Sequence, residues 1–148
     1  MISGKLVHLF VSHRDNIIGR VAEEIRRDPD MVYTRSILGP GLRQWHQELL
    51  GSLHDWLSTG DAQTVARHYQ HMGKERFKQN VPLHECVKDL CFVKGELLDF
   101  VEENIFNKDS MALYAEEELD RQVGRFFDLV TVNMVQGYEV AAQREVGA

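Results

Sequence analysis

The sequence predicts an all-α protein. Apolar residues recur at helical spacing along most of the chain, and no segment shows the two-residue alternation of a strand between turn signals. The chain has 148 residues, of which 43% are hydrophobic and 27% charged, as in one globular domain. A chain of this length buries enough surface to fold without a disulfide or a metal. We therefore expect residues 1–148 to form a single helical domain.

Two amphipathic helices are predicted in the first sixty residues. The first covers 2–27, where apolar positions keep helical spacing until Asp28-Pro29-Asp30 interrupts them. The second follows the turn Gly39-Pro40-Gly41 and covers 42–57, with an apolar face more than four turns long.

Cap residues define two further helices in the middle of the chain. Thr59 or Asp61 is expected to cap a helix over 62–77, because both side chains offer an oxygen to the first amides of a helix. Asn80 suits the left-handed position at the end of that helix. Pro82 then opens a helix over 83–105, which should be the most buried element.

The last predicted helix covers 111–144 and contains no proline. At 1.5 Å per residue it would be about 50 Å long. Its apolar positions form two adjacent seams, which favours pairing with a second copy, together with the helix over 2–27. The alternative is that both seams meet other helices of the same bundle. The residues expected at the dimer contact are Leu119, Val123, Phe126, Phe127, Val130 and Met134.

Charge and apolar run lengths exclude several partners. The formal net charge is −6, which offers no clustered positive surface for nucleic acid. The apolar runs are too short for a signal peptide or a membrane span, so no membrane insertion is expected. Cys86 and Cys91 stand five apart on one predicted helix and cannot bridge. Their separation predicts a reducing, cytoplasmic location.

Seven histidines make metal and haem sites worth testing. His68 and His71 share a helical face, but a closed metal site needs about four ligands and no second pair stands at comparable spacing. We expect both on a half-exposed flank, with no metal and no cofactor. The alternative is a haem or other tetrapyrrole held by His68, His71 or His84, none of which the spacing singles out.

His13 is the candidate pH-sensitive position. It interrupts the apolar stripe between Phe10 and Ile17, so it should face inward or toward a partner. A buried imidazole needs a hydrogen-bond partner, and burial opposes its protonation. The alternative is an ordinary core or interface histidine.

Nothing in the sequence predicts an enzyme. Cys91-Phe92-Val93-Lys94-Gly95 resembles the His-x-x-Lys-Gly string of phosphotransfer bundles, but a cysteine stands at the phosphorylated position. We expect Cys91 on the apolar side of its helix, with low reactivity. The chain also lacks a nucleophile elbow and a glycine-rich phosphate loop.

A set of short motifs resembles one bacterial family. The motifs are Trp56-Leu57-Ser58-Thr59-Gly60-Asp61, then Tyr69, Gly73 and Arg76, then Val81-Pro82-Leu83 with Val87, Leu90 and the 94–97 stretch. Together they resemble the RsbRD N-terminal domain, the sensory domain of stressosome RsbR paralogues and of some sensor kinases. The resemblance is strongest over 43–101. The family usually has glycine where Asn80 stands, and asparagine tolerates the same backbone region.

The resemblance implies a globin-like bundle without haem, with long terminal helices that dimerise. It implies a non-catalytic signal-input domain that relays a signal through its C-terminal helix to an output domain or partner protein. The other alternative is a helical adaptor that takes a partner's helix on its exposed seam. If the core holds a pocket, we expect it to be lined by Trp45, Trp56, Tyr69, Met72, Leu90 and Leu97.

Overall fold

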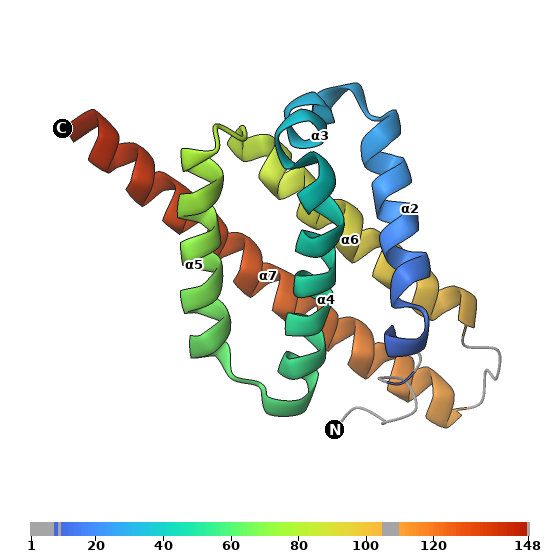
Figure 1. Cartoon of the computed structure of the whole chain (residues 1–148). Coiled ribbons are helices and arrows are strands. Elements are labelled where there is room, and N and C mark those ends of the chain that lie inside the picture. The colour runs from blue at the N-terminus through green and yellow to red at the C-terminus, as the bar shows by residue number, and fades with distance from the viewer. Residues whose placement is uncertain (1–7, 9, 105–109, 148) are drawn as a thin grey trace.

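The computed structural model describes residues 8, 10–104 and 110–147, and every regular element within these residues is a helix (Figure 1). The predicted all-α fold is therefore confirmed. The elements are α2 (Arg14–Arg27), a 3₁₀ turn (Pro29–Met31), α3 (Val32–Leu38), a second 3₁₀ turn (Gly39–Gly41), α4 (Leu42–Thr59), α5 (Ala62–Lys78), α6 (Leu83–Asn104) and α7 (Ser110–Gly147).

The helices form two crossing layers. Helices α2, α4 and α5 lie side by side in front of α6 and α7 (Figure 1). The most extensive contact joins α5 to α7, while α2 packs on both α6 and α4. The core fills the space between the layers, with Leu49, Tyr69 and Leu97 fully buried.

The predicted first helix is interrupted. His13 lies in a turn, with φ −113° and ψ 14°, and α2 begins only at Arg14. The expectation of one continuous helix over 2–27 is therefore wrong at His13; positions 1–7 and 9 lie outside the described residues. The His13 carbonyl accepts from the Ile17 amide at 3.1 Å, and its half-buried ring packs 5.0 Å from the Phe100 ring.

The predicted caps are confirmed at both ends of α5. The Asp61 carboxylate accepts hydrogen bonds from the Thr64 amide at 3.2 Å and from its hydroxyl at 2.6 Å. Asn80 takes the left-handed conformation, with φ 63°. Pro82 precedes α6, and its carbonyl accepts from the amide of Cys86 at 3.2 Å.

Helices α5 and α7 cross with their backbones in contact. A Cβ atom added to Gly73 would lie 2.1 Å from the carbonyl oxygen of Met134, and one added to Gly137 would lie 2.0 Å from that of Gln70. Beside this crossing, the Gln70 side-chain amide donates to the Asn133 side chain at 2.9 Å. The crossing can form only because both positions lack a side chain.

The apolar seam of α7 is buried within one chain. Its residues pack against α4, α5 and α6, because α7 runs beneath the front layer and in contact with α6. The prediction that this seam faces a second molecule is wrong. The alternative, that the seam meets other helices of the same bundle, agrees with the structure. The six residues have exposed fractions between 0% and 3%: Leu119, Val123, Phe126, Phe127, Val130 and Met134.

Candidate functional site

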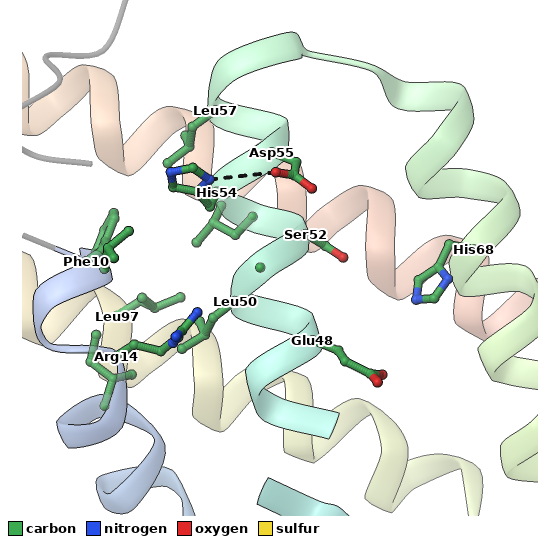
Figure 2. Close-up of a pocket in the computed structure, with 14 residues that line it drawn as sticks. Phe10, Arg14, Glu48, Leu50, Ser52, His54, Asp55, Leu57, His68 and Leu97 are labelled. Carbon is green, nitrogen blue, oxygen red and sulfur yellow. Dashed lines mark ion pairs between the residues drawn. The ribbon is translucent and has the colours of Figure 1, made fainter. Parts of the chain in front are cut away.

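A cavity of about 640 Å³ lies where the start of α2 meets α4 (Figure 2). Its volume lies within the range of small-molecule sites, which are concave, mostly apolar and carry a few polar groups. Its wall is mainly apolar. The apolar lining consists of Phe10, Val11, Ile17, Leu50, Leu53, Leu57 and Leu97.

Helix α4 contributes both leucine side chains and a glycine to the wall of this cavity. Leu49 and Leu53 are fully or almost fully buried in the core, and Leu53 also reaches the cavity. Leu50 and Leu57 line the cavity on the side of α2. Gly51 lines the cavity between them, and a Cβ atom added there would meet nothing within 4 Å. The missing side chain of Gly51 thus leaves space that any larger residue would occupy.

The polar groups of the lining are divided by charge across α4. Arg14 lies on the same side of α4 as Phe10 and Leu97, whereas Glu48 and His68 lie toward α5 (Figure 2). His54 and Asp55 stand at the end of the cavity, with His54 Nδ1 3.7 Å from Asp55 Oδ1. The cavity therefore has a basic flank toward α2 and an acidic flank toward α5.

The residues predicted to line a single pocket are divided among several pockets. Of the predicted lining residues, Leu97 lines the large cavity, and Trp56 and Tyr69 line a second one of about 410 Å³ between α4 and α5. Leu90 lines a third pocket, of about 320 Å³, between α6 and α7, and Trp45 and Met72 line none of these three. The predicted space is occupied, because the Tyr69 ring packs edge-on against Trp45 at 6.1 Å and against Phe126 at 6.3 Å.

A buried polar cluster joins α4 to α6, and sequence reasoning missed it. The Trp45 indole N–H donates to Asp89 Oδ2 at 2.7 Å, and His46 Nε2 lies 2.7 Å from Asp89 Oδ1. Asp89 and His46 are 3% and 1% exposed. Asp89 directly precedes Leu90 in the helix predicted to be most buried, and that signal could have marked it. None of these three residues lines either cavity. Their hydrogen bonds join α4 to α6 and so stabilise the packing of these two helices.

Burial perturbs the charged groups around this cluster. The Arg76 guanidinium lies 4.7 Å from the centre of the Trp45 ring and donates to Gln79 Oε1 at 3.0 Å. Desolvation lowers the pKa of Arg76, partly offset by the negative charges around it. Desolvation also raises the pKa of the Cys86 thiol to about 12.

The histidine candidates for haem or metal lie on the surface. His68, His71 and His84 are exposed, and of the three only His68 lines either of the two cavities, at the rim toward α5. Within the described part of the chain, no three side chains of His, Cys, Asp or Glu come together as metal ligands would. Of the three histidines proposed as haem ligands, only His68 lies at a cavity, and it lies on the less apolar flank.

The two cysteines lie in different environments. Cys91 is exposed, whereas Cys86 is buried, and both are free thiols. The expectation that Cys91 lies on the buried apolar side is wrong, because Cys91 is exposed. It lines the third pocket, of about 320 Å³, together with Phe127 and Thr131 of α7.

Comparison with protein-family models, curated proteins and solved structures finds no match to this chain. The resemblance to the RsbRD N-terminal domain therefore stays a prediction that depends on the motifs quoted above. Across the residues described, no helix is both long enough and apolar enough to cross a membrane.

Proposed function

We propose that this chain is a non-catalytic signal-input domain, and that its signal is a small amphipathic molecule bound between α2 and α4. The observation that carries the proposal is the cavity of about 640 Å³, whose apolar wall and few polar groups suit such a ligand. The resemblance of the motifs to a sensory family supports the same function.

The packing of the helices supports a route from the cavity to α7. Helix α2 rests on α4 and α6, and α6 packs along α7. A ligand that moves α2 would therefore shift α6 through Leu97, which lies at the cavity. Beyond Tyr138, whose hydroxyl donates to the Val81 carbonyl at 2.7 Å, most residues of α7 are exposed. This end of α7 is the surface to which a downstream partner would bind.

Filling the cavity tests the proposal. The neutral fluorophore N-phenyl-1-naphthylamine should bind the wild-type protein, and Gly51→Leu should weaken that binding at least about tenfold by occupying the same space. The matched control is Gly19→Leu, in the middle of α2 at an exposed position where an added Cβ atom meets nothing within 4 Å. Equal binding to the wild type and Gly51→Leu would overturn the proposal.

The relay is tested by amide hydrogen exchange. Binding of the fluorophore should change exchange rates in the 139–147 segment of α7 in the wild type, and Gly51→Leu should abolish that change. A change confined to α2 and α4 would contradict the relay while leaving the cavity as a binding site.

We also propose a homodimer, with a different contact surface from the one that the sequence predicted. Since the seam is buried, association must use residues such as Val132 and Val140, which are 55% and 36% exposed on α7. Light scattering should then show a dimer that Val132→Lys with Val140→Lys converts to a monomer. A wild-type monomer that captures one stoichiometric partner protein would instead favour the adaptor. The free thiols of Cys86 and Cys91 support a cytoplasmic location.

A further inference from the structure

We propose that the ligand of this cavity is a single-chain amphiphile with a carboxylate head group, and that Arg14 binds the head group. The inference depends on the proposed function, because it names the class of molecule that would occupy the same cavity. It follows from two observations. Arg14 has no ion-pair partner among the described residues, and the charged groups of the lining are divided across α4.

Arg14 is an unpaired cation beside an apolar wall. Its exposed side chain lies beside Leu50 and Leu97 on the α2 flank of the cavity (Figure 2). Among the described residues, no carboxylate forms an ion pair with it, whereas Arg20 and Arg43 have acidic partners. Other arginines, such as Arg67, also lack such a pair, and what distinguishes Arg14 is its position at the apolar wall of the cavity.

The neighbouring carboxylates do not compensate this charge. Asp15, next in the sequence, pairs with Arg43 at 3.1 Å. Glu48 lies on the opposite flank and accepts a hydrogen bond from Gln44 at 3.2 Å. Asp55 lies beside His54 at the end of the cavity, away from Arg14. Among the residues that the structure describes, the α2 flank of the cavity thus has a cationic side chain and no carboxylate paired with it.

The Arg14 side chain favours the carboxylate head group, and the apolar wall favours the alkyl chain. A guanidinium binds a carboxylate through two parallel N–H···O hydrogen bonds, and such pairs are stronger than neutral ones. A neutral or cationic ligand would remove water from Arg14 without replacing it, which is unfavourable. The apolar wall formed by Leu50, Leu57 and Leu97 suits an alkyl chain.

Three probes that share one alkyl chain test the head group. Isothermal titration calorimetry would compare dodecanoate, dodecan-1-ol and dodecyltrimethylammonium, the two ions below their micelle concentrations and the alcohol below its solubility limit. The wild type should bind dodecanoate at least about tenfold more tightly than the alcohol, and the cation most weakly. Arg14→Gln should remove the preference for dodecanoate. The control Arg67→Gln, at an exposed arginine of α5 hydrogen-bonded to the Gln63 carbonyl, should keep it.

The outcomes separate this inference from the proposed function. If the wild type binds the alcohol as tightly as dodecanoate, or if Arg14→Gln keeps the preference, the head-group inference is wrong. It is also wrong if no dodecyl compound binds while N-phenyl-1-naphthylamine binds the wild type and not Gly51→Leu. In each of these cases the cavity stays a ligand site. If the fluorophore also fails to distinguish Gly51→Leu from the wild type, the proposed function falls as well.

Discussion

Gly73 of α5 and Gly137 of α7 each lie against the backbone of the opposite helix. A Cβ atom on either residue would come within about 2 Å of a carbonyl oxygen across the crossing. A backbone atom cannot rotate away as a flexible side chain can, so the two helices would have to separate. This crossing sets the distance between α5 and α7, the pair with the most extensive contact in the fold.

Gly137→Ala should therefore destabilise the protein, although alanine is the better helix former. Overpacking costs about 1–3 kcal/mol and the gain in helix propensity is at most about 1 kcal/mol, so we expect a net loss of roughly 1–2 kcal/mol. Urea unfolding measures it. The control is Gly95→Ala in α6, where the added atom meets nothing within 4 Å and stability should rise by about 0.5–1 kcal/mol. A stabilised Gly137→Ala protein would contradict the crossing.

Asp89→Ala should be among the most damaging single changes. It leaves the Trp45 indole N–H and His46 Nε2 buried without their acceptor, a loss of about 3 kcal/mol. The variant should unfold at clearly lower urea concentration. Asp128→Ala removes an exposed carboxylate of α7 and should change stability by less than about 0.5 kcal/mol. Similar losses for both variants would show that the cluster contributes no specific stability.

The carboxyl of Glu24 should make stability depend on pH near neutrality. Desolvation first, then a hydrogen bond with Glu96 and the charges of Glu96 and Asp99, raise its pKa from 4.5 to about 7. A raised pKa in the folded state means that the protonated form stabilises the fold and that this stability is lost as the pH rises through about 7. The melting temperature should fall between about pH 5.5 and about pH 8.

Glu24→Gln should flatten that pH dependence, because the amide cannot ionise. Glu23→Gln is the control, since a hydrogen bond from Arg26 lowers the pKa of Glu23 and keeps it ionised over the whole range. Parallel melting curves for the wild type and Glu24→Gln would contradict the assignment.

The two thiols should differ in reactivity. Cys91 is exposed, whereas Cys86 is buried with its pKa raised to about 12, so little Cys86 thiolate exists at about pH 8. Iodoacetamide should modify the native protein once, as measured by intact mass. Cys91→Ser should abolish the modification and Cys86→Ser should leave it unchanged. Rapid double modification of the native wild type would contradict the burial of Cys86.

The helices were predictable where local chemistry decides them. Asp61 and Asn80 define the ends of α5 through their own side chains and backbone preferences, which a sequence displays directly. The burial of the α7 seam was not predictable in the same way. Helical spacing shows that residues such as Val123 and Phe126 form an apolar face, but it does not show which helix covers that face.

The candidate site was predicted less well than the fold. Trp45 and Tyr69 were predicted to line one pocket, but both are buried in the core, where their rings pack edge-on, and of the two only Tyr69 lines the second cavity. The actual cavity depends on Gly51, a residue without a side chain, and on the turn at His13 that places Arg14 beside α4. Both features arise from the arrangement of helices in space, which periodicity does not encode.

Because α5 packs mainly on α7, with all of α6 between them in the sequence, this protein cannot complete its core early in synthesis. Tyr69 leaves the ribosome well before Phe126, its packing partner. A nascent chain that has not reached Leu119 would hold the inner faces of α4, α5 and α6 open to water. Stable folding should therefore wait for the 119–138 segment, and during that interval the chain would be a substrate for chaperones.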